Sequence, residues 1–398
     1  MNKLLGGAAM LLAVGVPGVL QAQGVREGTL LVLSKRDRTL SIVDLRSLEV
    51  LGRVPVGNDP HEVIASSDGR TAYVSNYGFG SYNTLAVVDL PRRAALAPID
   101  LGPLRGPHGL AFVGGKTWFT AETAKAIGRY DPATGKVDFV LGTGQDRTHM
   151  IHVSADGQEI VTTNVSSGTV SMIYQEELRM RPPPPQGTRT GGPEGPVGRV
   201  GPGSPGSPGG PGGPGSGEGP GRPGPRTDWA ETVIRVGNGS EGFDVSPDGR
   251  EIWVANAQDG TISIVNRASR GVVATLPANV PGANRLKFTI DGRRVLVSTL
   301  GGPDVVVLDA GTRKEIARIP IGHGAAGIVM EPDGSRAFVA CSPDNYVAVV
   351  DLASLKVTGR IVAGDEPDGL AWAVQPSGVP EQASDLGAAE FYKNSSLR

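Results

Sequence analysis

The sequence predicts an all-β fold made of one four-stranded unit repeated seven times. Three observations lead to this prediction. The 398 residues include 59 glycines and 32 prolines, about twice the usual share, and both residue types break helices. An Asp-Gly turn recurs at intervals near 43 residues. Short segments rich in β-branched and aromatic residues follow these turns, as expected of strands.

The first 23 residues are expected to be a secretory signal peptide. Lys3 gives a short basic start, an apolar stretch covers 4–20, and a cleavage site is expected near Ala22. The alternative for this segment is an N-terminal membrane anchor. No other apolar run reaches spanning length. We therefore expect a periplasmic or secreted protein whose mature chain has no membrane span.

The repeat is clearest at its turns, which occur at Asp68–Gly69, Asp156–Gly157, Asp248–Gly249, Asp291–Gly292 and Asp333–Gly334. The last two intervals are 43 and 42 residues. Gly114–Gly115 marks a further copy midway between the first two turns. Asp and Gly tolerate positive φ, so each turn predicts a tight hairpin. A fixed period of this length indicates a repeat architecture and not separate domains.

Each copy contains four predicted strands. In the copy around Asp248 the opening strand is 241–246, the second 251–256 and the third 261–266. The fourth strand carries a basic residue near its start, as in KEIARIPIG at 314–322. Asp44, Asp89, Asp131, Asp309 and Asp351 recur after the third strand. Recurrence in this position predicts a turn role for these aspartates.

The two ends of the repeat region complete each other. Segments 29–34, 39–44 and 49–57 match strands two to four of a copy that lacks its opening strand. Segment 368–373 matches an opening strand with nothing after it. Pairing them closes a ring and leaves only short sheet edges exposed. The prediction is a seven-bladed β-propeller over 24–374, with a polar C-terminal tail over 375–398.

One segment interrupts the repeat. Residues 177–228 include a run from Arg181 to Arg226 that is mostly glycine and proline. This composition predicts a disordered insertion. It leaves blade four between the third and the outermost strand, far from the central channel, so we expect a spacer and not a lid.

Segments 247–266 and 332–367 resemble the YVTN-type β-propeller repeat of the YncE-like family. The resemblance covers residues 29–374 and implies the propeller fold. It implies no single function, because similar propellers include lactonases, domains of nitrous oxide reductase and haem-d1 nitrite reductase, amine-dehydrogenase subunits and surface-layer proteins.

Candidate ligand-binding residues follow from aligning the seven opening strands at the channel mouth. One aligned position holds His61, His108, His149, Glu241, Arg285, Ala326 and Asp368. Three of the five histidines share this register on adjacent blades. The alignment is open to a slip of one residue at Arg285, whose neighbour is Asn284. Polar residues at strand starts also simply bond exposed carbonyls, so the ring of six polar residues is a hypothesis for a site.

Two chemical hypotheses compete for this ring. In the first, His61, His108, His149 and Glu241 bind a divalent transition metal, because imidazole and carboxylate suit such ions. In the second, His149 and Glu241 act as general base and acid on a small anionic substrate, and Arg285 holds its carboxylate or oxyanion. Similar residue types serve seven-bladed lactonases. The sequence leaves open whether the protein is an enzyme.

A third hypothesis is a non-catalytic scaffold that binds a protein partner. The chain carries 38 basic and 40 acidic residues, a net charge of −2, which excludes a strong electrostatic attraction to nucleic acid. The single cysteine, Cys341, allows no intrachain disulfide and is predicted to fill the core. Trp118, Trp253 and Trp372 are also predicted to lie in the core between blades.

Overall fold

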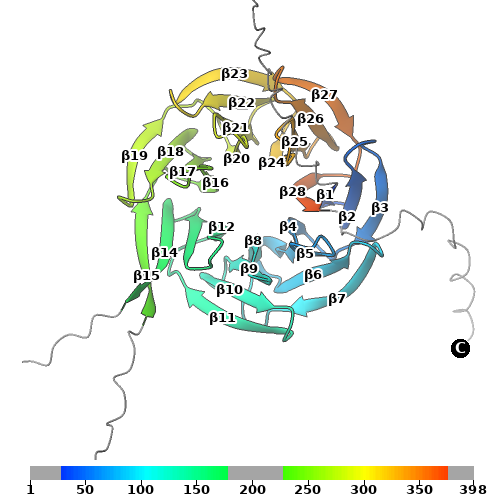
Figure 1. The fold of residues 1–398 in the computed structure, drawn as a ribbon, viewed down its shortest axis with the longest axis vertical. Coiled ribbons are helices and arrows are strands. Elements are labelled where there is room, and N and C mark those ends of the chain that lie inside the picture. The colour runs from blue at the N-terminus through cyan, green and yellow to red at the C-terminus, as the bar shows by residue number, and fades with distance from the viewer. Residues whose placement is uncertain (1–27, 178–226, 375–398) are drawn as a thin grey trace, which may run out of the picture.

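The computed structural model describes residues 28–177 and 227–374 (Figure 1). These residues form seven four-stranded antiparallel sheets arranged around a central axis, which confirms the predicted seven-bladed propeller. The predicted signal peptide over 1–23, nearly all of the insertion and the tail over 375–398 lie outside the described residues.

The strands are given blade by blade, from the inner to the outer edge. Blade one contains β28 (Pro367–Val374), β1 (Gly28–Ser34), β2 (Thr39–Asp44) and β3 (Val50–Pro55). Blade two contains β4 (Pro60–Ala65), β5 (Thr71–Asn76), β6 (Thr84–Asp89) and β7 (Ala94–Asp100). Blade three contains β8 (Pro107–Val113), β9 (Lys116–Ala121), β10 (Ala126–Asp131) and β11 (Lys136–Gly142). Blade four contains β12 (Thr148–Val153), β13 (Glu159–Asn164), β14 (Thr169–Glu177) and β15 (Thr227–Arg235).

Blade five contains β16 (Ser240–Val245), β17 (Glu251–Asn256), β18 (Thr261–Asn266) and β19 (Gly271–Leu276). Blade six contains β20 (Ala283–Phe288), β21 (Arg294–Thr299), β22 (Asp304–Asp309) and β23 (Lys314–Pro320). Blade seven contains β24 (Ala325–Met330), β25 (Arg336–Cys341), β26 (Tyr346–Asp351) and β27 (Lys356–Ile361). Within the described residues the helix content is a single 3-10 turn, η1 (Gly78–Gly80).

The N- and C-terminal strands close the ring as predicted. β1 pairs with β28 in antiparallel register, with Thr29 opposite Ala373 and Leu31 opposite Ala371. β28 therefore supplies the inner strand that β1–β3 lack. This pairing hydrogen-bonds both edges that an open ring would leave exposed.

The core lies between the blades. The second and third strands of most blades are largely buried, because neighbouring blades cover both of their faces. Trp118, Trp253 and Cys341 are buried as predicted, whereas Trp372 is partly buried against the core of blades one and seven. The outer strands alternate between half-buried and exposed side chains, since one of their faces meets solvent.

The turn residues take the predicted roles. Each Asp-Gly turn places its glycine at a φ between 68° and 75°. In the turn of blade five, Asp248 Oδ1 accepts hydrogen bonds from the Ser246 hydroxyl and the Arg250 N–H. The aspartates after the third strands accept backbone N–H bonds, as Asp309 does from Thr312. These short local bonds fix the hairpins of each blade.

The insertion leaves blade four at its outer edge (Figure 1). β14 and β15 stay paired as far as Glu177 and Thr227. The predicted boundaries of 177 and 228 therefore lie inside the strands by one or two residues. The remainder of the inserted segment lies outside the described residues.

Candidate functional site

A β-bulge follows the first residue of every inner strand. In blade two, Pro60 lies opposite Asn76 while Val63 lies opposite Val74, so one extra residue is accommodated. The same shift occurs in the inner strands of the other six blades. Bulges re-aim side chains and are common next to active sites.

The bulge determines which residue of each inner strand lies at the channel mouth. The second residues of the inner strands are His61, His108, His149, Glu241, Asn284, Ala326 and Asp368. Six of these match the predicted ring. In blade six the prediction was wrong by one residue, because Ala283 pairs with Thr299 and Asn284 therefore takes the place given to Arg285.

A residue in the left-handed region precedes every inner strand. These residues are Asp59, Gly106, Arg147, Gly239, Gly282, Gly324 and Glu366, with φ between 48° and 69°. Glycine adopts this conformation freely, whereas another residue pays about 1 kcal/mol or more. Asp59, Arg147 and Glu366 bear that cost, and each forms an ion pair. Strain of this kind is concentrated at functional sites in proteins.

A second ring of residues lies beside the first. The residue after each second strand donates its N–H to the carbonyl of the left-handed residue, as Tyr77 does to Asp59 and Glu122 to Gly106. The other members of this ring are Lys35, Val165, Ala257, Leu300 and Ser342. Sequence reasoning missed Lys35, Tyr77 and Glu122. An alignment of the residues that follow the second strands would have found these three polar residues at one equivalent position in blades one, two and three.

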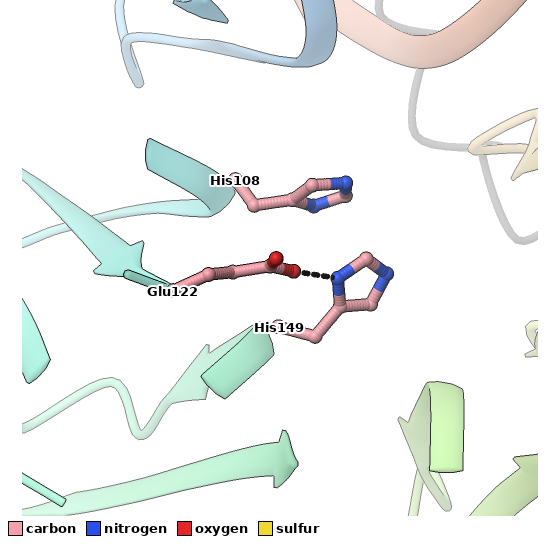
Figure 2. A group of neighbouring side chains, drawn as sticks. All are labelled: His108, Glu122 and His149. Atoms are coloured by element: carbon pink, nitrogen blue, oxygen red, sulfur yellow. Dashed lines mark hydrogen bonds and ion pairs between the residues drawn. The ribbon is translucent and has the colours of Figure 1, made fainter. Parts of the chain in front are cut away.

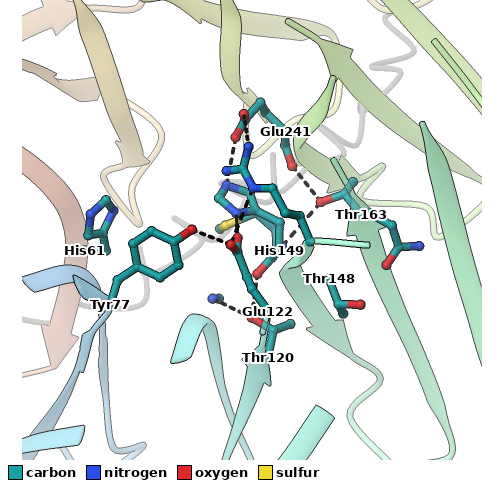
Figure 3. A network of polar contacts seen from close by, with 12 residues as sticks. His61, Tyr77, Thr120, Glu122, Thr148, His149, Thr163 and Glu241 are labelled. Atoms are coloured by element: carbon teal, nitrogen blue, oxygen red, sulfur yellow. Dashed lines mark hydrogen bonds and ion pairs between the residues drawn. The ribbon is translucent and has the colours of Figure 1, made fainter. Parts of the chain in front are cut away.

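Six of these residues form a polar group that we call the His–Glu cluster: Tyr77, His108, Glu122, Arg147, His149 and Glu241. Figure 3 shows Tyr77, Glu122, His149 and Glu241 of this cluster. His149 lies between the two carboxylates. Its Nδ1 hydrogen-bonds Glu122 Oε1, and its Nε2 lies 2.8 Å from Glu241 Oε2. Tyr77 donates its hydroxyl to Glu122 Oε2 at 2.6 Å.

Threonine hydroxyls hold the inner strands of this region in place. The Thr120 hydroxyl accepts the Gly109 N–H and donates to the carbonyl of His149 in the next blade. The Thr163 hydroxyl does the same between blades four and five, donating to the carbonyl of Glu241 at 2.6 Å (Figure 3). The blades that carry the cluster are therefore fixed to one another by hydrogen bonds at the mouth.

The two carboxylates decide the charge of His149. Burial alone would lower its pKa, but Glu241 and Glu122 outweigh burial and raise it. Burial would likewise raise the pKa of Glu241, but His149 and two arginines lower it to about 2. The pKa of Glu122 is also lowered despite its burial, chiefly by the hydrogen bond from His149. The two carboxylates thus favour the protonated form of His149.

His108 differs from its neighbour. Its side chain is fully buried, and burial together with the charge of His149 lowers its pKa well below the usual value. Its Nδ1 has no hydrogen-bond partner. The His108 and His149 rings lie 3.8 Å apart between centroids. His108 is therefore a neutral imidazole with an unsatisfied buried nitrogen, which is costly unless a partner binds it.

One trio of ligand atoms converges in the cluster (Figure 2). A nitrogen of His108, a nitrogen of His149 and a carboxylate oxygen of Glu122 all lie within 4.8 Å of one another. The predicted metal set of His61, His108, His149 and Glu241 does not gather in this way. His61 belongs to a different ionic group, and Glu241 contacts His149 through the nitrogen opposite the one that faces Glu122.

The second ionic group surrounds His61. Its Nε2 lies 3.2 Å from Asp59 Oδ1 and its Nδ1 3.6 Å from Asp368 Oδ2. Lys35 pairs with Asp368 at 2.9 Å. Burial would raise the pKa of Asp368, but Lys35 and His61 lower it. The predicted ligand residues His61 and Asp368 thus form an ionic contact with each other, and the His61 ring also lies 5.0 Å from the His108 ring between centroids.

Arg285 forms its ion pair with Glu62 and not with its predicted catalytic partners. Its Nη2 lies 2.5 Å from Glu62 Oε1, and its guanidinium is nearly buried. His149 and Glu241, the other two residues of that hypothesis, do contact each other. Arg147 takes the place next to them, with its Nε 3.4 Å from Glu122 Oε2 and its Nη1 4.0 Å from Glu241 Oε1.

No protein-family model and no curated protein matches the chain. Solved structures do match it. A protein of unknown function from Desulfotomaculum acetoxidans is 15% identical, with a TM-score of 0.64 over 87% of this chain and 98% of that one. A candidate 6-phosphogluconolactonase from Bacteroides uniformis is 13% identical, with a TM-score of 0.62 over 87% of this chain and 100% of that one. Hydrazine synthase of Kuenenia stuttgartiensis is 17% identical, with a TM-score of 0.60 over 85% and 99%.

These similarities establish the seven-bladed propeller fold and nothing more specific, because identities this low are shared by propellers of unrelated function.

The described residues include no helix of the length and apolar character needed to cross a bilayer.

Proposed function

We propose that this chain is an exported propeller of the YVTN type that binds a divalent transition metal ion at the channel mouth. His108, Glu122 and His149 are the proposed ligands. The observation that supports this proposal is the convergence of one ligand atom from each of the three residues within 4.8 Å. The buried Nδ1 of His108 also has no hydrogen-bond partner. Two imidazoles and one carboxylate suit zinc, iron, copper or nickel.

The surroundings of the trio match those of metal centres. A metal-bound histidine usually gives its other ring N–H to a carboxylate, which orients the ring and increases its basicity. Glu241 lies 2.8 Å from the outer nitrogen of His149 and fits this role. Tyr77 and Arg147 contact the second oxygen of Glu122, so the first oxygen faces the trio. The ion would replace the proton that His149 now shares with Glu122.

Export and repeat type complete the proposal. The basic start and apolar stretch of 1–23 support a signal peptide. The repeat segments 247–266 and 332–367 support the YVTN type. Export would place the site in the periplasm or outside the cell.

Metal binding is tested on the purified protein by elemental mass spectrometry and by calorimetric titration of the chelator-treated protein with zinc. One ion per chain is expected, with at least about a tenfold loss of affinity in His108→Ala and Glu122→Gln. His323→Ala is the matched control, because His323 is exposed and pairs with Asp344 outside the cluster. Zinc affinity that is unchanged in both cluster variants overturns the proposal.

A second candidate function is hydrolysis of a small anionic substrate in the manner of a lactonase. The contact between His149 and Glu241, with Arg147 beside both carboxylates, favours it. The similarity to a candidate 6-phosphogluconolactonase supports it at the level of fold alone. A panel of lactones tests this function. Absence of turnover, or turnover unchanged in Glu241→Gln, would exclude it.

A further inference from the structure

A cavity of about 410 Å³ borders the His–Glu cluster at Tyr77, Glu122 and Arg147. Its lining includes Tyr77, Phe79, Glu122, Lys125 and Arg147. The volume falls within the range of small-molecule sites in proteins. We propose that this cavity binds a small organic carboxylate with an apolar body, whose carboxylate is held by Arg147 and whose apolar part rests on Phe79. This proposal goes beyond metal binding and does not require it.

Arg147 provides the carboxylate-binding group. Its guanidinium has five N–H donors, and its ion-pair contacts are with Glu122 Oε2 at 3.4 Å and Glu241 Oε1 at 4.0 Å. Both contacts are long for a charge-assisted hydrogen bond, which is usually 2.7–2.9 Å. The side chain is 42% exposed while its two partners are largely buried. The N–H groups on its open side are therefore placed to donate to a ligand carboxylate in the two-pronged geometry that arginine favours.

The backbone at Arg147 supports a role for this side chain. The equivalent residue is glycine in four of the seven blades, and Arg147 occupies the same left-handed conformation with φ 54°. The fold therefore accepts glycine here and carries a strained arginine instead. An observed strain of this kind is a reason to infer function.

Phe79 provides the apolar surface. It lies in the 3-10 turn η1, is 90% exposed and has a φ of 50° between two glycines that also have positive φ. Its ring lies 6.4 Å from that of Tyr77, whose hydroxyl reaches Glu122. The two rings form an aromatic wall that leads from solvent to the cluster. A ring on the ligand would bury apolar area against this wall.

The charges around the cavity favour binding of a carboxylate through specific hydrogen bonds. Lys125 is paired with Asp146 at 2.5 Å, and both are exposed. Arg147 contacts the carboxylates of both Glu122 and Glu241. Positive and negative groups are therefore interleaved, and the cavity presents no uniformly positive surface to an anion. A carboxylate would bind through the aimed N–H donors of Arg147 and not through general attraction.

The probes are benzoate, its neutral analogue benzamide, and acetate, titrated calorimetrically into the chelator-treated protein and again into the zinc-loaded protein. We expect benzoate to bind at least about tenfold more tightly than benzamide, which lacks the charge. Acetate should bind more weakly than benzoate, because it buries less apolar surface. Equal binding of benzoate and benzamide, or no binding of either, overturns the proposal.

Variants at Arg147 and Phe79 test the two proposed ligand contacts. Arg147→Gly should lose at least about tenfold in benzoate affinity, and Arg147→Lys should recover only part of it, because lysine lacks the planar fork. Phe79→Ala should weaken benzoate by about fivefold and leave acetate unchanged. Leu300→Ala is the control, since Leu300 is an exposed apolar residue after the second strand of blade six. Melting temperatures establish that each variant is folded. Benzoate affinity that is unchanged in both Arg147 variants overturns the assignment.

The metal-binding proposal and the carboxylate-binding proposal can be overturned independently of each other. Benzoate binding to the chelator-treated protein with no zinc uptake would remove the metal and keep the carboxylate site. Zinc uptake without benzoate binding would overturn the carboxylate site and keep the metal site.

Discussion

His149 Nε2 lies 2.8 Å from Glu241 Oε2, and the opposite nitrogen of the same ring hydrogen-bonds Glu122. The two carboxylates come from different blades, three and five, and the histidine between them comes from blade four. One imidazole thus connects three blades at the channel mouth. This arrangement leads to specific expectations about metal affinity and stability.

The first prediction concerns the role of Glu241 behind His149. Glu241→Gln removes the charge that orients and activates the histidine, so zinc affinity should fall about tenfold to a hundredfold. Calorimetric titration measures the change. Glu62→Gln is the matched control, because Glu62 is also a mouth carboxylate but pairs with Arg285. A loss of equal size in both variants would mean that general charge, and not this contact, sets the affinity.

The second prediction contrasts the two central histidines in the metal-free protein. His108→Leu removes a buried nitrogen that has no partner, so the free energy of unfolding should stay the same or increase. His149→Leu leaves two carboxylates buried without their cation and should cost about 3–5 kcal/mol. Urea unfolding of the chelator-treated variants measures both values. Comparable losses in the two variants would contradict the different charge states assigned to these rings.

The third prediction concerns the left-handed residues before the inner strands. Gly282 has a φ of 68°, and an added Cβ would lie 3.0 Å from the Gly301 nitrogen. Gly282→Ala should therefore lower the free energy of unfolding by about 1–2 kcal/mol. Gly142→Ala is the control, because an added Cβ there meets nothing within 4 Å and the φ lies outside the left-handed region. Urea unfolding should separate the two, and equal stabilities would show that the turn tolerates a side chain.

The fourth prediction concerns acid stability. Hydrogen bonds from Ser66, Ser154, Ser246 and Thr289, together with backbone N–H groups, lower the pKa values of Asp68, Asp156, Asp248 and Asp291. A carboxylate whose pKa is lower in the folded state stabilises the fold above its unfolded pKa, and this stability is lost as the pH falls through the folded pKa. The free energy of unfolding should therefore decrease as the pH drops below about 4.

Asp248→Asn tests the contribution of one turn. Asparagine keeps an oxygen for the Arg250 N–H but cannot ionise, so stability should depend less on pH below about 4. Ser246→Ala, which removes the hydroxyl donor to Asp248, should flatten the same part of the curve. Denaturation midpoints between about pH 2 and 6 measure the slope. An undiminished slope in both variants would mean that other carboxylates dominate acid unfolding.

Local chemistry explains why the fold could be predicted. The Asp-Gly turns, the period near 43 residues and the incomplete copies at 29–57 and 368–373 are all properties of short segments. Turn chemistry and strand propensity act within about ten residues, and seven repetitions reinforce the signal. The blade count and the pairing of β1 with β28 follow from these segments.

The site could be predicted only in part. The inner-strand register placed His61, His108, His149, Glu241 and Asp368 at the mouth. In blade six the mouth position belongs to Asn284 and not to Arg285, because Ala283 is the residue that pairs with Thr299. Glu122 and Tyr77 were not predicted, because they follow second strands and only the opening strands, where three histidines share one position, were aligned.

The sequence by itself therefore determined the all-β repeat, the ring closure and the set of polar residues at one end of the channel. The tertiary structure decided which of those residues meet. His149 joins Glu122 and Glu241, while His61 joins Asp59 and Asp368. The physical reason is that these contacts cross from blade to blade. Their geometry depends on how the blades pack and on the left-handed turn before each inner strand, and neither is encoded in the spacing of residues along one blade.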